Sequence, residues 1–192
     1  VGFIGSTGSG KSTALDLLAG ASQPTRGRVS VRGRVAPVLA LGVGFEADMT
    51  APENAYLNAS LLGLSRVEGE ARLDAILEFA DLRDFASVPV RHYSSGMLAR
   101  LGFAVAMHVD ADVLLVDEVL AVGDASFQKK CLDRIFALKD QGRTLMFVTH
   151  DLPMAKELCA RAIWIHSGRI EADGPVAEVI ERYVGGREEP TA

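Results

Sequence analysis

The sequence predicts an α/β fold built on a parallel sheet, with a helical subdomain inserted into it. Two short apolar runs, "DVLLVDE" at 112–118 and "TLMFVTH" at 144–150, have the continuous hydrophobicity of strands that are buried on both faces. Helical patterns alternate with the strands, which is typical of parallel sheets. The stretch from about 50 to 108 is helical without an intervening strand, and this predicts the inserted subdomain.

The first elements in chain order form a strand, a turn and a helix. Residues 1–4 are a short apolar strand end, and 5–10 are a turn rich in glycine and serine. Residues 11–19 read as a helix with Leu15, Leu17 and Leu18 available for burial, and Gly20 ends it as a C-cap. Two extended pieces, "GRVSVRG" and "RVAPVLAL", then predict a hairpin region with glycines at its turns.

Helical patterns dominate the middle of the chain. Ser65 and Glu68 have the spacing of a capping box. The predicted apolar face of the helix that follows comprises Leu73, Ile76, Leu77 and Ala80. The stretch "HYSSGMLARLGFAVAM" at 92–107 reads as a second capped helix with an apolar stripe.

The last third returns to strands and helices. We expect a helix over 126–141 that ends at Gly142, and a hairpin in "RAIWIHSGRIEADG". Pro175 then opens a last helix that runs to about Val184.

The composition indicates one globular domain over residues 1–192. The chain is 48% hydrophobic and 23% charged, and its net charge of −5 gives no general attraction to nucleic acid. One loose basic group stands out, and we interpret it as exposed hairpin positions rather than a nucleic-acid patch. It consists of Arg26, Arg28, Arg32 and Arg34.

Cysteine usage and hydropathy argue against a zinc-binding protein and against a membrane-spanning protein. Cys131 and Cys159 form no C-x-x-C pair and no pattern with histidines, which argues against a zinc site and fits a reducing cytosol. No apolar run approaches the roughly 18 residues that a membrane-spanning helix needs. Because the chain opens in the middle of a strand without Met, we expect that an N-terminal part precedes it.

The turn "GSTGSGKST" matches the phosphate-loop pattern G-x-x-x-x-G-K-[ST]. Glycines allow backbone N–H groups to approach phosphate oxygens, and the following helix N-terminus favours an anion. In this pattern Lys11 reaches the β- and γ-phosphates, and the Ser12 hydroxyl ligates Mg²⁺. The predicted nucleotide-binding residues are Gly5, Ser6, Thr7, Gly8, Ser9, Gly10, Lys11, Ser12 and Thr13.

Two predicted strand ends add groups suited to phosphate chemistry. Asp117 and Glu118 end the run "DVLLVDE", where Asp117 can hold the metal and Glu118 can deprotonate the attacking water. His150 ends "TLMFVTH", and it can hydrogen-bond the γ-phosphate because ligands bind at the carboxyl ends of parallel strands. The remaining histidines, which we interpret as structural, are His92, His108 and His166.

These patterns together resemble the ATP-binding domain of ABC transporters. The resemblance depends on Ser94 and Gly96 at a helix start, in the places of the family signature, and on Asp124, six positions after Glu118. It implies a P-loop NTPase fold with a RecA-like core and a helical subdomain. It also implies a homodimer that sandwiches ATP and Mg²⁺, in which Ser94, Ser95 and Gly96 complete the partner's site. Asp124 then belongs to a loop at the dimer interface.

Three stretches are similar to one branch of that family, the ATP-binding subunits of polysaccharide exporters. They are "YSSGMLARLGFAVA", "DEVLAVGDASFQKK" and "RAIWIHSGRI". The branch implies export of O-antigen, capsule or teichoic acid, powered by ATP hydrolysis. It implies a peripheral protein on the cytoplasmic face of the plasma membrane, bound to an integral membrane permease that makes most of the polysaccharide contacts. A nucleic-acid partner is not expected.

The sequence departs from the family pattern in several places. Ser95 and Met97 replace the second glycine and the glutamine of the usual signature. No glutamine occurs in "LALGVGFEADMTAPEN", where the family has one for Mg²⁺, and its place falls near Ala40 or Leu41. Three alternatives remain open: Glu46 substitutes for it, the metal keeps one more water, or coupling runs through other residues of this loop. We also expect the N-terminal antiparallel sheet, its adenine-stacking aromatic residue and a C-terminal sugar-binding domain to be absent from the chain.

Two other functions remain open at this point. A soluble P-loop phosphotransferase would use the phosphate loop but has no need of Ser94 and Gly96. The other is a non-transport ABC ATPase acting on DNA or ribosomes. Proteins of that kind usually show long coiled-coil insertions or tandem copies, and the net charge of −5 does not favour this function.

Overall fold

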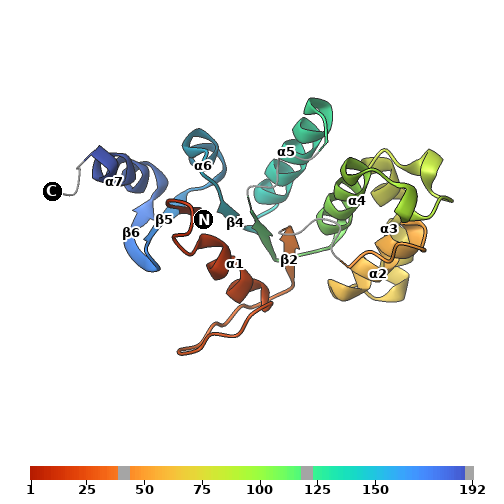
Figure 1. The fold of residues 1–192 in the computed structure, drawn as a ribbon, viewed down its shortest axis with the longest axis horizontal. Helices are drawn as coiled ribbons and strands as arrows, with labels where there is room; N and C mark the ends of the chain where they lie inside the picture. Colours follow the sequence, from red (N-terminus) through yellow and green to blue (C-terminus); the bar gives the residue numbers. More distant parts are fainter. Residues whose placement is uncertain (39–43, 118–122, 189–192) are drawn as a thin grey trace. The chain divides into compact units, whose positions relative to one another are not determined.

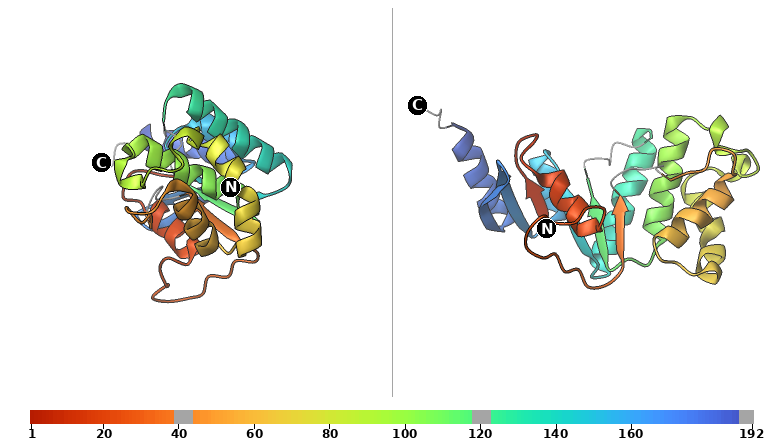
Figure 2. Two further views of the ribbon diagram at one scale, coloured as in Figure 1. Left: turned by 90° about the vertical axis from the view of Figure 1, so that its right-hand side faces the viewer. Right: turned by 60° about the horizontal axis from the view of Figure 1, so that its bottom comes forward.

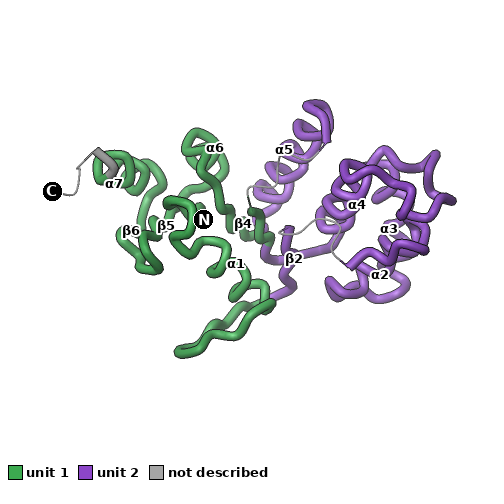
Figure 3. The backbone as a smooth tube through the Cα atoms, in the orientation of Figure 1, with its two compact units in different colours: residues 1–32, 114–118, 144–192 green, residues 33–113, 119–143 purple. Residues whose placement is uncertain are grey.

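The computed structural model describes residues 1–38, 44–117 and 123–188 (Figure 1). The chain divides into two compact units (Figure 3). Unit 1 comprises residues 1–32, 114–118 and 144–192, and unit 2 comprises residues 33–113 and 119–143.

Unit 1 contains a sheet in the strand order β3-β4-β1-β5-β6. Its strands are β1 (Gly2–Ile4), β3 (Val113–Val116), β4 (Thr144–Val148), β5 (Arg161–His166) and β6 (Arg169–Pro175). β1 pairs in parallel with both β4 and β5, and all four residues of β3 are buried. β5 and β6 form an antiparallel hairpin. The predicted parallel sheet and C-terminal hairpin are therefore confirmed.

The helices of unit 1 are α1 (Lys11–Ala19), α6 (Leu152–Leu158) and α7 (Val176–Glu188). The chain passes from β1 into α1 through the phosphate loop, which can be followed in red in Figure 2. α1 has the predicted bounds and ends at Gly20, whose φ of 76° is the left-handed conformation of a glycine C-cap. α7 continues past the predicted end at Val184.

Unit 2 is mainly helical. It contains β2 (Val35–Val38), α2 (Ala51–Leu61), α3 (Arg66–Phe79), α4 (Ser95–His108) and α5 (Ala125–Asp140), with short 3₁₀ turns at Arg83–Phe85 and Val90–His92. A common core joins α2, α3 and α4, and it includes Ala55, Ile76, Leu101 and Val105. None of the helices within the described ranges combines the length and the apolar character needed to cross a membrane.

The start and the face of α3 follow the sequence pattern. The Ser65 backbone N–H donates to Glu68 Oε2 at 2.8 Å, and the Glu68 backbone N–H donates to Ser65 Oγ at 3.4 Å. These two bonds are the predicted capping box. Ile76, Leu77 and Ala80 are buried on the core side of the helix, as predicted.

The predicted hairpin near the start of the chain is wrong over residues 28–34. These residues form no strand, and regular extended structure begins only at Val35. Val29 and Val31 alternate with polar residues, but they are 38% and 36% exposed. A strand requires a hydrogen-bonded neighbour, and within the described ranges no strand pairs with this segment. Arg26, Arg28 and Arg32 are therefore exposed positions of an irregular segment.

Candidate functional site

The phosphate loop connects β1 to α1 and requires glycine at both of its ends. Gly5 has a φ of 151°, and a Cβ there would lie 2.2 Å from the Ile165 carbonyl oxygen. Gly10 is the residue before α1 and has a φ of 108°, which is unfavourable for other residues. Substitution at Gly5 would therefore force the loop away from β5.

Backbone hydrogen bonds hold the phosphate loop in place. The Ser9 N–H donates to the Ser6 carbonyl at 3.1 Å, and the Gly168 N–H donates to the Ser9 carbonyl at 2.9 Å. Gly168 lies in the turn between β5 and β6. The hairpin thus supports the loop from the side.

Lys11 is anchored to the loop by its ammonium group. The side chain is buried, and Nζ donates to the carbonyl oxygens of Gly5 at 3.0 Å and Ser6 at 2.8 Å. An ammonium group has three N–H donors, so Lys11 can also bind a phosphate oxygen without losing these contacts.

Ser12 and Asp117 come together from distant parts of the chain. Ser12 lies in the first turn of α1 and Asp117 directly follows β3, and the Ser12 hydroxyl donates to Asp117 Oδ2 at 3.3 Å. Neighbouring oxygen ligands of an octahedral Mg²⁺ ion, each about 2.1 Å from it, lie about 3 Å apart. A hydroxyl and a carboxylate are hard oxygen donors, so this pair fits Mg²⁺ in both spacing and chemistry.

The structure describes only some of the predicted catalytic residues. Glu118 lies outside the described residues, as do Ala40 and Leu41. His150 lies two residues after the end of β4, which is parallel to β1, so His150 and Gly5 follow strands at the same end of the sheet. The Asp151 N–H donates to the Thr149 hydroxyl at 2.9 Å, and this bond fixes the turn that carries His150.

The Ser94 signature lies in unit 2, at the start of α4. The Ser94 hydroxyl caps the helix by accepting the Met97 N–H at 3.2 Å, and both Ser94 and Ser95 are exposed. Leu101 and Val105 are buried on the same helix. The predicted helix start and apolar stripe are therefore confirmed, and the exposed N-terminus of α4 is suited to an anion.

Asp124 caps α5, and its carboxylate has two partners within unit 2. Oδ1 accepts the Phe127 N–H at 2.9 Å, and Oδ2 accepts from Arg100 Nη2 at 2.6 Å. The Phe127 N–H, together with Arg100, lowers the pKa of Asp124. Arg100 could not be predicted as part of this site, because its partner Asp124 lies 24 positions away and no local pattern links the two.

His108 has the structural role predicted for it. Its Nδ1 lies 2.7 Å from the Ala104 carbonyl oxygen, and its ring packs edge-on against Phe79. The carbonyl can only accept a hydrogen bond, so Nδ1 carries the proton. Burial lowers the pKa of His108 and favours the neutral ring.

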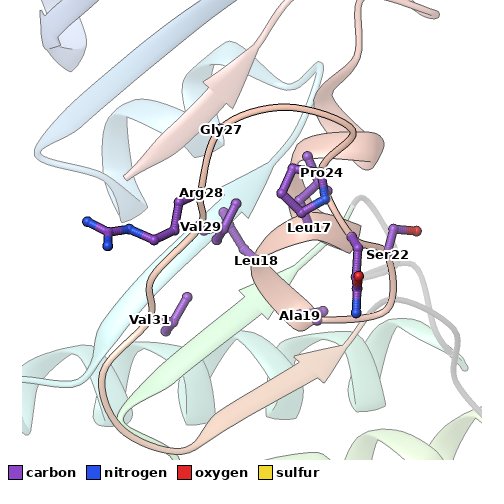
Figure 4. A pocket seen from close by; sticks show the side chains of 11 residues that line it. Leu17, Leu18, Ala19, Ser22, Pro24, Gly27, Arg28, Val29 and Val31 are labelled. Atoms are coloured by element: carbon purple, nitrogen blue, oxygen red, sulfur yellow. The ribbon is translucent and has the colours of Figure 1, made fainter.

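A separate pocket of about 580 Å³ lies at the other end of α1 (Figure 4). Leu17 and Leu18 of the helix and Val29 and Val31 of the irregular segment line it. A helix C-terminus carries partial negative charge, which disfavours phosphate. This pocket is therefore poorly suited to the phosphates of a nucleotide.

Comparison with known proteins identifies the family. Residues 1–121 match the family model described as "ABC transporter". The chain belongs to the ABC transporter family. The resemblance deduced from the phosphate loop, Ser94, Gly96 and Asp124 is thereby confirmed, and ABC membership favours the transporter hypothesis over a phosphotransferase.

Relatives of this ABC protein include polysaccharide export proteins. The chain is 49% identical to the O-antigen export system ATP-binding protein RfbB of Klebsiella pneumoniae, over 95% of this chain and 74% of that protein. It is 46% identical to the protein of the same name from Myxococcus xanthus, of which it covers 42%. It is 44% identical to the teichoic acids export ATP-binding protein TagH of Levilactobacillus brevis, of which it covers 50%. Each alignment spans 95% of this chain.

Solved structures share the ABC fold. An ATP binding subunit of an ABC transporter matches with a TM-score of 0.82 and 28% identity, over 98% of this chain and 82% of that chain. A dimeric, post-hydrolysis state of the ATP-binding cassette MJ0796, bound to ADP and Pi, matches with a TM-score of 0.75 and 24% identity, over 91% of this chain and 84% of that chain. The predicted P-loop fold class is therefore confirmed.

Proposed function

We propose that the protein is the ATP-binding and ATP-hydrolysing subunit of an exporter of a lipid-linked polysaccharide of the O-antigen, capsule or teichoic acid type. The observation that carries the proposal is the Ser12–Asp117 pair beside the phosphate loop, in an ABC chain 49% identical to an O-antigen export protein. ATP supplies the free energy, and the polysaccharide is contacted mainly by a separate membrane permease.

The phosphate loop and the residues that follow β3 and β4 have different roles in ATP hydrolysis. Backbone N–H groups of residues 8–13 and the Lys11 ammonium bind the phosphates, and Ser12 and Asp117 hold Mg²⁺. Mg²⁺, when bound, neutralises charge on the β- and γ-phosphate oxygens. Glu118 accepts a proton from the attacking water, whose oxygen bonds to the γ-phosphorus as the bond to the bridging oxygen breaks. His150 hydrogen-bonds the γ-phosphate and orients that water.

A second copy of the chain completes each site. One phosphate loop leaves a side of the γ-phosphate open to water, and a second helix N-terminus can close it. Ser94, Ser95 and Gly96 at the start of α4 supply hydroxyl and backbone donors across the dimer, and Asp124 lies in the loop beside the interface. ATP then favours the closed dimer, and hydrolysis opens it.

The loop over residues 46–50 is the proposed docking face for the permease. Asn54 is fully buried, and its Nδ2 donates to the carbonyls of Glu46, Met49 and Thr50 at 3.0, 3.2 and 3.1 Å. Its Oδ1 accepts the Glu46 N–H at 2.7 Å. The side chains of residues 46–49 remain exposed on this ordered loop. An exposed loop held in this way is a suitable contact for a membrane subunit. In this proposal the protein lies on the cytoplasmic face of the plasma membrane.

A trapping experiment tests the ATPase assignment. Glu118→Gln keeps the shape of the side chain but removes the base, so we expect ATP to remain bound in a closed dimer while turnover falls about a hundredfold or more. Glu171→Gln, an exposed change on β6, is the matched control. Normal hydrolysis by Glu118→Gln would disprove the assignment of the base.

Genetic replacement tests the transport assignment. Cells that carry only the Glu118→Gln protein should lose surface polysaccharide, whereas Glu171→Gln cells should keep it. Affinity capture of the wild-type protein should also recover an integral membrane protein. Unchanged surface polysaccharide, or capture of ribosomes or DNA alone, would favour a non-transport ABC ATPase.

A further inference from the structure

Arg100 binds carboxylates from two other elements of unit 2. It lies on α4, six residues after Ser94. Its Nη2 is 2.6 Å from Asp124 Oδ2, at the start of α5, and its Nη1 is 3.6 Å from Asp81 Oδ2, in the turn after α3. Only 21% of the Arg100 side chain is exposed, whereas the side chains of Asp124 and Asp81 are 62% and 54% exposed. Arg100 therefore joins α4 to α5 and to the end of α3.

Lys130 closes this network. It lies on α5, and its Nζ is 3.1 Å from Asp81 Oδ1 and 4.9 Å from the centre of the Phe79 ring. The chain of ion pairs therefore starts at Asp124 on α5, passes through Arg100 and Asp81, and returns to α5 at Lys130. Such a network holds three helices together better than isolated surface pairs would.

The surroundings of Arg100 are shaped to its guanidinium group. The guanidinium carbon lies 4.9 Å from the centre of the Phe127 ring, within the range of a cation–π contact. A Cβ at Gly123 would lie 3.1 Å from Arg100 Nε and 3.2 Å from Phe127 Cβ. Gly123 also has a φ of 72°. A larger residue at position 123 would therefore push against Arg100.

The two oxygens of Asp124 have separate tasks. Oδ1 caps α5 through the Phe127 N–H, and Oδ2 binds Arg100. Asparagine can retain the cap through its carbonyl oxygen but loses the charge. Asp124→Asn therefore separates the ion pair from the helix cap.

We propose that Arg100 is a positioning residue for ATP hydrolysis, which holds the start of α5 at a fixed spacing from the helix that begins at Ser94. The inference rests on the proposed function, in which Ser94 and Asp124 both meet the partner copy. Both groups must reach the partner together for the γ-phosphate to be enclosed. A misplacement of about 1 Å can cost about a hundredfold in rate.

A double-mutant cycle with Arg100→Gln and Asp124→Asn tests this role. Each single change should lower kcat about tenfold or more, because the donors at the closed site lose their alignment. KM for ATP should stay within about twofold, because the phosphate loop itself is unchanged. The double variant should be no slower than the slower single variant. Arg100→Lys, which can still pair with Asp124, should restore part of kcat.

The control and a second measurement distinguish the possible failures. Arg66→Gln breaks the exposed Arg66–Glu70 pair on α3 and should leave kcat unchanged. Hydrogen exchange at the amides of 123–128 should rise in Arg100→Gln, independently of ATP turnover. Additive losses in kcat, full activity of Arg100→Gln, or unchanged exchange would each overturn the proposal. A wild-type protein that fails to hydrolyse ATP would instead refute the proposed function, and the exchange result alone would then decide whether Arg100 fixes the start of α5.

Discussion

The Ser12 hydroxyl donates to the Asp117 carboxylate at 3.3 Å, although 105 positions separate the two residues in the chain. The contact forms because α1 follows β1 and Asp117 follows β3, and both strands belong to one sheet. Two oxygen atoms of a kind that Mg²⁺ prefers thus lie close together beside the phosphate loop.

Asp117→Asn should therefore raise the concentration of Mg²⁺ that the protein needs for ATP hydrolysis. An amide oxygen carries no full charge, so we expect the Mg²⁺ concentration for half-maximal ATP hydrolysis to rise about tenfold or more. A titration of MgCl₂ at saturating ATP measures it. Ser22→Ala removes an exposed hydroxyl beyond α1 and should have no effect. An unaltered Mg²⁺ requirement in Asp117→Asn would remove Asp117 from the metal site.

Gly5→Ala should destabilise the protein much more than Gly8→Ala. The new Cβ at Gly5 would collide with the Ile165 carbonyl oxygen, which belongs to the backbone and cannot turn aside, whereas a Cβ at Gly8 meets nothing within 4 Å. Gly8 has a φ of 78°, so its substitution costs about 1 kcal/mol of backbone strain. We expect Gly5→Ala to lower the free energy of unfolding by about 3 kcal/mol, as measured by urea denaturation. Equal effects would argue against the close packing of the loop on β5.

Asn54→Ala should unfold the loop over residues 46–50. The change leaves the Glu46 N–H without its partner, and it removes the donor to three carbonyl groups. A loss of about 3 kcal/mol in the free energy of unfolding is expected, because buried polar groups lose their hydrogen bonds. Asn58→Ala is the matched control, because Asn58 on the same helix makes one such bond, to the Asn54 carbonyl. Similar losses for both variants would contradict the central role of Asn54.

His108 should make the protein less stable in mild acid. Burial lowers the pKa of His108 in the folded state, so the unfolded chain binds a proton more readily. The free energy of unfolding should therefore fall as the pH drops below about 6.5, the ordinary histidine pKa. The fall should continue until the pH passes the lower pKa of the folded state. His108→Gln should remove this part of the pH dependence, and urea denaturation at several pH values measures it. An unchanged slope in the variant would assign the effect to other groups.

Local patterns were sufficient to predict most helices, the sheet and the phosphate loop. The Ser65–Glu68 capping box and the Gly20 C-cap depend on residues within one helical turn, so they can be predicted from the local sequence alone. The buried strand β3 is likewise visible as a continuous apolar run. Such features need no knowledge of distant partners.

Other features depend on distant partners, which a single sequence does not disclose. Val29 and Val31 have the alternation of a strand, but alternation alone does not provide a hydrogen-bonded neighbour. Arg100 reads as an ordinary helix cation until Asp124 and Asp81 are placed beside it. Asn54 reads as a surface residue, whereas folding buries it under the loop that it holds.

The hydrogen bond from Gly168 to Ser9 makes the length of a distant turn important to nucleotide binding. Residues 167–168 connect β5 to β6, and surface hairpins of this kind are common places for insertions or epitope tags. In this protein an added residue would move the Gly168 N–H away from the Ser9 carbonyl. The exposed, irregular segment near Arg28 is therefore a safer place for a label than this turn.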